Sequence, residues 1–434
     1  MTQGRALRVL AALSLIAAGS LPLGWAGPVE ARAMKAASVP ALLQDLDAAQ
    51  PGDEITIAPG TYEMPPLRLR QSGAAGQPII LRAAALGSVE LRSRATEFIK
   101  VSGSDWVFEN LDIAGICADD TDCEHAFHIV SGADRIVIRH NRIRDYNAHI
   151  KGNGEGGRFP NDVLIEGNWL FDTHHRHTDN PIAPIDVVGG QRWIVRGNLI
   201  ADYGKTIDHP AVVNDDFGYA LFFKGNSSST LIERNVVACS MLLPPLSYTR
   251  GISLGGSATG PQFCEGDCNA DENHDSTLRN NVVLDCPMED GIYLWRAKSS
   301  RVLANTLIGT YGIEARGKDS SAAILDNLVD GGIVASEGAT IEASDNVTAG
   351  PADLPLSRYF ADARDGKLSL RPGTHFDLQV PTLSDVSDDL CGHQRPQDAS
   401  VPGAIQYGGA SCDVAEKLLA DYRAYAAKLR GAKP

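Results

Sequence analysis

The stretch LIERNVV, residues 231–237, decides the fold, because its pattern recurs along most of the chain. Each copy contains a few aliphatic or β-branched residues, a polar spacer, an asparagine and two more apolar residues. The asparagines of this pattern are Asn110, Asn141, Asn168, Asn198, Asn235, Asn281, Asn305 and Asn327. Such repetition is typical of a solenoid built from short strands, in which each coil stacks on the one before. The pattern therefore predicts an all-β fold, a single-stranded parallel β-helix.

The asparagines have a structural role in such a fold. At a turn between two strands, an asparagine tolerates the left-handed backbone region, and its amide can bond the asparagine of the next coil. We therefore expect a ladder of asparagines along the axis, and we assign none of them to chemistry.

Composition and charge favour one acidic, turn-rich domain. The 434 residues include 43 glycines and carry a formal net charge of −15, which argues against a nucleic acid partner because no basic run offsets it. A helix over Val39–Ala49 is expected to cap a solenoid at residues 34–350. Residues 351–434 are expected to pack on or cap the solenoid and to end in a helix over Val414–Leu429. We expect a monomer.

The N-terminal residues predict export. Arg5 and Arg8 precede an apolar run over Val9–Ala18, and small residues follow at Gly24–Ala26 and Ala31–Ala33. This is the pattern of a secretory signal peptide over residues 1–33, which is too short for a membrane span and is removed on export. The mature protein is expected in the periplasm or outside the cell.

The eight cysteines are expected to form disulfides, because an exported protein meets an oxidising compartment. An alternative for Cys264 and Cys268 is a zinc site with His274, although a second pair of ligands is lacking. The expected pairs are Cys117 with Cys123, Cys239 with Cys286, Cys264 with Cys268, and Cys391 with Cys412.

Two phrases near the start resemble a known family. PGDEITIAPGTY, residues 51–62, and GQPIILR, residues 76–82, are similar to the opening coils of the right-handed β-helix polysaccharide lyases that include chondroitinase B and many alginate lyases, polysaccharide lyase family six. The resemblance implies an enzyme that cleaves an acidic, uronic-acid-containing polysaccharide by β-elimination. Mannuronan epimerases begin in much the same way, so these phrases favour the fold more strongly than the reaction.

Alignment of the strands that follow the loops predicts one outward surface. Phe127, Ile150, Ile185, Leu221, Ile252, Ile292 and Ile313 form a column that should point inward, so their neighbours should point outward. His149 falls beside the inward column and is alternatively a core histidine. The side chains expected to line a substrate groove are His125, His128, His149, Lys151, Asp186, Tyr293, Trp295, Glu314 and Arg316.

A lysine and an arginine in this groove are the candidates for chemistry. Elimination at a uronate needs a cation to neutralise the carboxylate, a base for the proton alpha to it and an acid for the leaving oxygen. In the resembled lyases these are calcium, a lysine and an arginine one coil later. Lys224 and Arg250 match those positions, so the resemblance implies Lys224 as base and Arg250 as acid or carboxylate neutraliser. Tyr219 is the alternative base.

The calcium ligands of the resembled lyases are missing from their usual place. Their Glu-x-Glu phrase before the lysine is replaced here by NDDFGY, residues 214–219. Asp215 and Asp216 are candidate ligands for calcium, the cofactor that the resemblance implies, although adjacent loop carboxylates are often solvated instead. Without a metal, the uronate would be held by His125, His128, Lys151 and Arg250.

Three other functions stay open. Glycoside hydrolysis generally uses two carboxylates, but no two of the available ones share a column on adjacent coils. They are Asp186, Asp215, Asp216, Asp290 and Glu314. A uronate epimerase would use the same proton abstraction as a lyase. The third alternative is a non-catalytic β-helix that binds polysaccharide.

Overall fold

The computed structural model of the protein describes residues 31–206, 218–245, 248–350, 352–397, 400–407 and 411–431. Residues 1–30 of the predicted signal peptide lie outside this part, as do Asp215 and Asp216. Ala31 to Pro434 form one compact unit. Arg32 donates its backbone N–H to Asp53 Oδ1 at 3.0 Å, so the folded body begins beside the predicted end of the signal peptide.

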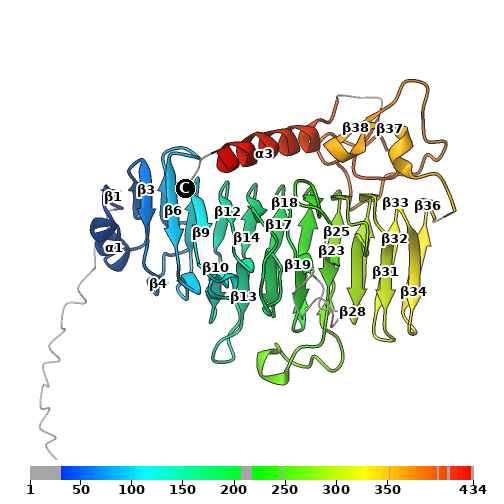
Figure 1. Cartoon of the computed structure of the whole chain (residues 1–434). Helices are drawn as coiled ribbons and strands as arrows, with labels where there is room; N and C mark the ends of the chain where they lie inside the picture. The colour runs from blue at the N-terminus through cyan, green and yellow to red at the C-terminus, as the bar shows by residue number, and fades with distance from the viewer. Residues whose placement is uncertain are drawn as a thin grey trace, which may run out of the picture. The chain divides into compact units, whose positions relative to one another are not determined.

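Three long parallel sheets form the body, and each coil contributes one strand to each sheet (Figure 1). The twelve-stranded sheet contains β1 (Ala33–Ala36), β2 (Glu54–Ile57), β5 (Ile79–Ala83), β8 (Trp106–Glu109), β11 (Val137–Arg139), β14 (Leu164–Glu166), β17 (Ile194–Arg196), β21 (Leu231–Glu233), β25 (Thr277–Arg279), β29 (Ser300–Leu303), β32 (Ser321–Leu325) and β35 (Thr340–Ser344). The eleven-stranded sheet contains β3 (Gly60–Glu63), β6 (Val89–Ser93), β9 (Asp112–Gly115), β12 (Arg142–Arg144), β15 (Trp169–Phe171), β18 (Leu199–Ala201), β22 (Val236–Ala238), β26 (Val282–Leu284), β30 (Thr306–Ile308), β33 (Leu328–Asp330) and β36 (Val347–Ala349).

The ten-stranded sheet carries the predicted outward surface. It contains β4 (Leu67–Leu69), β7 (Glu97–Val101), β10 (His125–Val130), β13 (Ala148–Asn153), β16 (Ile185–Val188), β19 (Gly218–Lys224), β23 (Thr249–Leu254), β27 (Ile292–Trp295), β31 (Gly312–Arg316) and β34 (Gly332–Ser336). A short parallel sheet joins β20 (Ser227–Ser228), β24 (Asn273–His274) and β28 (Ala297–Lys298). The predicted right-handed parallel β-helix is confirmed.

A ladder of asparagines runs through the interior of the coils, as predicted. Except in Asn141, the first member, each side-chain oxygen accepts from the backbone N–H and the side-chain amide of the asparagine one coil earlier, as Asn281 does from Asn235 at 3.1 and 2.9 Å. The members are Asn141, Asn168, Asn198, Asn235, Asn281, Asn305, Asn327 and Asn346. All but Asn346 are at most 1% exposed, so the ladder pairs polar groups that the core would otherwise leave without partners.

Two details of the predicted ladder were wrong. Asn110 is not a member, because Leu111 occupies the equivalent place and donates its N–H to Asn141 Oδ1. The left-handed residue is also not the ladder asparagine but the residue before it, as at His140 (φ 54°) and Arg234 (φ 55°). The turn is therefore made outside the core, and the asparagine that follows it can point inward.

Both predicted helices are present. α1 (Val39–Asp47) begins after Ser38, whose Oγ accepts from the Ala41 N–H, and it buries Leu42 and Leu46 against the core of the coils. α3 (Val414–Gly431) follows the tail hairpin β37 (Phe360–Asp362) and β38 (Lys367–Leu370) and packs along the coils rather than over their end (Figure 1). Within the described residues, neither helix is apolar over the length that a bilayer requires.

The contact between α3 and the solenoid is aromatic and polar. The ring of Tyr422 packs edge-on against Phe171 of β15, with 5.1 Å between the ring centroids, and the Tyr422 hydroxyl donates to Asp202 Oδ2 at 2.6 Å. The tail therefore packs on the outside of the eleven-stranded sheet.

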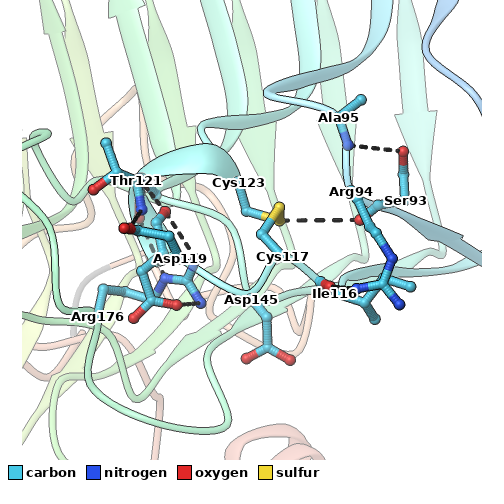
Figure 2. Close-up of a disulfide and its surroundings, with 12 residues drawn as sticks. Ser93, Arg94, Ala95, Ile116, Cys117, Asp119, Thr121, Cys123, Asp145 and Arg176 are labelled. Atoms are coloured by element: carbon cyan, nitrogen blue, oxygen red, sulfur yellow. Dashed lines mark hydrogen bonds and ion pairs between the residues drawn. A yellow bond between two sulfur atoms is a disulfide. The ribbon is translucent and has the colours of Figure 1, made fainter.

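All four predicted disulfides form: Cys117–Cys123, Cys239–Cys286, Cys264–Cys268 and Cys391–Cys412. The alternative zinc site was wrong, because Cys264 and Cys268 are bonded to each other. Figure 2 shows the Cys117–Cys123 bridge in the loop that leads into β10. The same loop is held by an ion pair of 2.9 Å between Arg176 Nη1 and Asp120 Oδ1, so the start of β10 is fixed by contacts across the coils.

Candidate active site

The predicted register of the ten-stranded sheet is confirmed. The inward column from Phe127 to Ile313 pairs residue by residue across seven neighbouring strands, and each of its members is at most 1% exposed. The outward column runs in the same register through His128, Lys151, Asp186, Phe222, Ser253, Tyr293 and Glu314. Adjacent coils of a parallel sheet lie about 4.8 Å apart, so these side chains form one continuous surface.

A cleft of about 1130 Å³ opens over this surface. Most of the predicted groove residues line it: His125, His128, Lys151, Asp186, Tyr219, Lys224, Arg250, Tyr293, Trp295 and Arg316. The cleft therefore collects cationic and aromatic side chains from consecutive coils, together with the carboxylates of Glu97, Glu124, Asp186 and Glu337. Its cationic side chains suit a negatively charged polymer.

The start of each strand bends, which brings a second row into the cleft. The pairing of β19 with β23 links Tyr219 to Arg250 and Leu221 to Ile252 and leaves out Ala220 between them. Tyr219 and Phe222 consequently both face the cleft, and their rings lie 5.5 Å apart. Simple alternation of side chains along the strand would have placed Tyr219 inside.

His149 was wrongly assigned to the groove. Its ring is fully buried, with Nε2 at 3.0 Å from the Phe171 carbonyl oxygen and 3.4 Å from Asp172 Oδ1. The reason is the same bend, because His149 lies between Ala148 and Ile150, at the position that the strand pairing leaves out. His149 is therefore the core histidine of the alternative interpretation.

Glu314 occupies the predicted outward column but is not among the residues that line the cleft. Its Oε1 accepts from the Ser336 hydroxyl of the next coil at 2.5 Å, which holds the carboxylate away from the opening. The predicted metal ligands Asp215 and Asp216 fall outside the described residues.

Lys224 lies on the floor of the cleft at the end of β19. Its Nζ donates to Ser257 Oγ at 2.9 Å and lies 5.1 Å from the centre of the Phe222 ring. Burial lowers the pKa of Lys224, and the charge of Lys151 adds to this effect, against opposing contributions from Asp186 and Glu272. A larger fraction of this amine is therefore neutral near pH 8 than for an exposed lysine.

Arg250 pairs in register with Tyr219, near the start of β19, whereas Lys224 ends that strand, and Arg250 is held from several directions. Its Nε donates to Glu289 Oε2 at 3.0 Å, its Nη1 donates to the Tyr219 hydroxyl at 3.2 Å, and its guanidinium lies 3.9 Å from the centre of the Tyr293 ring. Burial opposes the charge, but Tyr219, Glu289 and Tyr293 outweigh it and raise the pKa of Arg250. Arg250 is thus a fixed cation in the cleft.

Two acidic groups complete the charge distribution. Lys151 Nζ forms an ion pair of 2.7 Å with Asp186 Oδ1 on the next coil, so the charges of these two cleft residues are matched. Burial raises the pKa of Asp290 to about 7, although Asp290 is not among the residues that line the cleft.

A cluster missed in the sequence lies at one end of the cleft. Glu97, His125 and His128 each offer a ligand atom, and these atoms lie within 4.8 Å of one another. Within the described part of the chain, these residues are the one group of three or more His, Cys, Asp or Glu side chains that could hold a metal ion. Extending the alignment one coil earlier would have found it, because Glu97 pairs with His125 in the register.

The cluster does not fit calcium. Calcium takes six to eight oxygen ligands, whereas two of these three groups are imidazoles. No step of the chemistry below is therefore routed through calcium.

The chain was compared with known proteins by sequence and by structure. Residues 36–144 match the family model of chondroitinase B, which confirms the predicted resemblance of the opening coils. No curated protein sequence matches the chain.

Similar solved structures include a polysaccharide lyase family 6 alginate lyase, with 15% identity, 73% of this chain and 51% of that chain covered, and a TM-score of 0.33. A pectate lyase has 13% identity, coverage of 88% and 98%, and a TM-score of 0.49. A lacto-N-biosidase from Eubacterium ramulus has 13% identity, coverage of 72% and 64%, and a TM-score of 0.46. The match spans about half the length of the alginate lyase. These likenesses are too distant to carry an argument, so the reaction has to be derived from the cleft itself.

Proposed function

We propose that the protein is an exported lyase that cleaves a uronic-acid-containing polysaccharide by β-elimination, with Lys224 as the base and Arg250 as the group that neutralises the uronate. The observation that carries this proposal is the pairing, in one cleft, of a partly buried lysine with a lowered pKa and a fixed arginine. The chondroitinase B match over residues 36–144 supports the same class of reaction.

The cleft offers each of the three groups that elimination requires. Arg250 would pair with the uronate carboxylate, which makes the proton alpha to it removable. Lys224 would take that proton from the other side of Phe222, whose ring lies 5.1 Å from Nζ and 5.5 Å from the Tyr219 ring. A sugar stacked over Phe222 would then have the base on one side and the cation on the other. Tyr219, beside Arg250, would donate a proton to the leaving oxygen and is also the alternative base.

The remaining cleft residues would bind the polymer on either side of the scissile bond. His125, His128 and Lys151 extend toward the N-terminal coils, and Trp295 and Arg316 toward the C-terminal ones. Aromatic faces bind sugar rings by apolar contact, and cations bind uronates. This distribution favours an acidic polymer over a neutral one.

The rate of elimination is expected to rise with pH. A neutral amine is the active form of Lys224, and its pKa is lowered from the ordinary value of 10.5, so kcat/KM should increase through a pKa below that value and then level off. Ser257→Ala removes an acceptor of the charged amine and should move the rise to lower pH. Profiles of kcat/KM against pH for both proteins test this; a rate that falls over the same range would contradict a lysine base.

Arg250→Lys is expected to reduce kcat/KM by about 100-fold, because lysine keeps the charge but loses the fork that binds a carboxylate through two N–H groups. Arg364→Lys is the matched control, since Arg364 is an exposed arginine outside the cleft. Steady-state kinetics on a uronate polymer would show the loss in the first variant alone. Equal activity of the two variants would remove Arg250 from the proposed mechanism.

A glycoside hydrolase is the second candidate, and the raised pKa of Asp290 favours it, because a general acid must be protonated near neutral pH. Against it, Asp290 does not line the cleft, and Asp186 is paired with Lys151.

Incubation with alginates, glycosaminoglycans and bacterial exopolysaccharides distinguishes the candidates when ultraviolet absorbance and reducing ends are followed together. A lyase raises both signals, and a hydrolase raises reducing ends alone. An epimerase changes the uronate ratio without cleavage, and a binding module changes none of these. Only the first result supports the proposal.

A further inference from the structure

We infer that Glu97, His125 and His128 form a binding site for a divalent transition-metal ion of the zinc class at the N-terminal end of the cleft. This inference goes beyond the proposed lyase activity and does not depend on it. Two features carry it: the placement of the three ligands and a buried ring nitrogen without a partner.

The three ligands come from two adjacent strands, so the sheet fixes their spacing. Glu97 begins β7 and pairs in register with His125 at the start of β10, and the bend that follows turns His128 toward the same side. The two imidazole rings lie 4.9 Å apart, and His128 Nδ1 lies 2.5 Å from Glu97 Oε1. All three residues line the cleft, so an ion held here would keep open positions on its cleft side.

His125 contributes a nitrogen that lacks a partner. His125 is 9% exposed, and its Nδ1 is buried with no hydrogen-bond partner among the described residues. A buried imidazole nitrogen without a partner costs stability, which a metal bond would recover.

Contacts on both ring nitrogens orient His128. The Asn153 amide nitrogen donates to the Gly154 carbonyl oxygen, so its Oδ1 faces His128 Nε2, at 2.6 Å. Nδ1 therefore faces Glu97 Oε1, which brings the two ligand atoms together on the same side of the site.

The donor set selects the kind of ion. Two imidazoles and one carboxylate with open positions suit zinc, cobalt, manganese or iron, and Asn153 would orient His128 from behind as outer-shell partners do. The nearby cations are already matched, because Lys100 pairs with Glu155 at 3.2 Å and Lys151 with Asp186 at 2.7 Å. The charges of Lys100 and Lys151 are therefore compensated, and these lysines do not exclude a metal ion from the site.

The test is a calorimetric titration with zinc of protein that has been treated with a chelator and never unfolded. Absorption spectra of the cobalt-bound protein report whether nitrogen ligands bind the ion. The wild type should bind one equivalent, release protons and unfold at a higher temperature with zinc than without it. Glu97→Gln and His128→Ala should each weaken binding by about tenfold or more. His274→Ala is the matched control, because His274 lies on β24 outside the cleft and should leave binding unchanged.

The result is decisive in either direction. Glu97→Gln replaces one oxygen of the side chain by nitrogen and preserves its size. This variant therefore tests the site even if the His128→Ala variant does not fold. Absence of saturable binding, or equal affinity in the wild type and Glu97→Gln, would overturn the inference. Because the titration uses no substrate, its outcome is independent of the proposed lyase activity. Zinc binding can be found in a protein without lyase activity, and lyase activity can be found without zinc binding.

Discussion

Lys224→Ala is expected to lower kcat/KM for elimination by about 1,000-fold, the largest effect of any single change in the cleft. The variant removes the group that would take the proton alpha to the carboxylate, while Arg250 would still bind the uronate. The loss should therefore appear in kcat, with KM changed little. Initial rates of ultraviolet absorbance at several polymer concentrations separate the two constants.

Two controls make this result specific. Lys298→Ala removes an exposed lysine of β28 outside the cleft and should retain full activity. Tyr219→Phe tests the alternative base: it should reduce the rate less than Lys224→Ala if tyrosine only assists. Full activity in Lys224→Ala, with loss in Tyr219→Phe, would transfer the role of base to the tyrosine.

Asn235→Ala is expected to destabilise the fold by about 3 kcal/mol, because it breaks the ladder in its middle and leaves buried polar groups unpaired. Asn235 Oδ1 accepts from the backbone N–H and the side-chain amide of Asn198, and the Asn235 amide donates to the Val195 carbonyl oxygen at 2.9 Å. None of these groups can reach water, since both asparagines are fully buried. Equilibrium unfolding in urea measures the change.

Asn110→Gly is the matched control for the ladder variant. Asn110 stands in the same sequence phrase but occupies the left-handed turn (φ 61°) outside the ladder, and glycine adopts that conformation without strain. Its cost should stay below about 1 kcal/mol. Equal destabilisation by the two substitutions would show that the ladder does not hold the coils together.

Much of the fold was predictable because a solenoid repeats its pattern. The inward column from Phe127 to Ile313 aligned correctly, since stacking forces equivalent residues into register. Cys239 and Cys286 were paired correctly for the same reason, as they occupy equivalent places in the repeat. Lys224 and Arg250 were predicted to share one groove from the strand alignment and from the resemblance to the lyases, and both line the cleft.

What failed depended on breaks in that regularity. His149 was placed in the groove and Asn110 in the ladder, because a bend within the strand and a turn before the asparagine shift side chains by one position. Glu97 was missed because the strand alignment began at β10, one coil after the strand that carries it. Such shifts depend on backbone geometry, which the simple alternation of inward and outward residues along a strand does not encode.

The most direct test of the central claim is the mass of the oligosaccharides that the wild-type protein releases from a uronate polymer. Elimination breaks the bond to the leaving oxygen without adding water, so each fragment with a new non-reducing end should be lighter by one water than its saturated counterpart. Fragments of that mass, absent with Lys224→Ala, are the predicted result. Saturated fragments carrying the added water would contradict elimination and direct attention to the carboxylates.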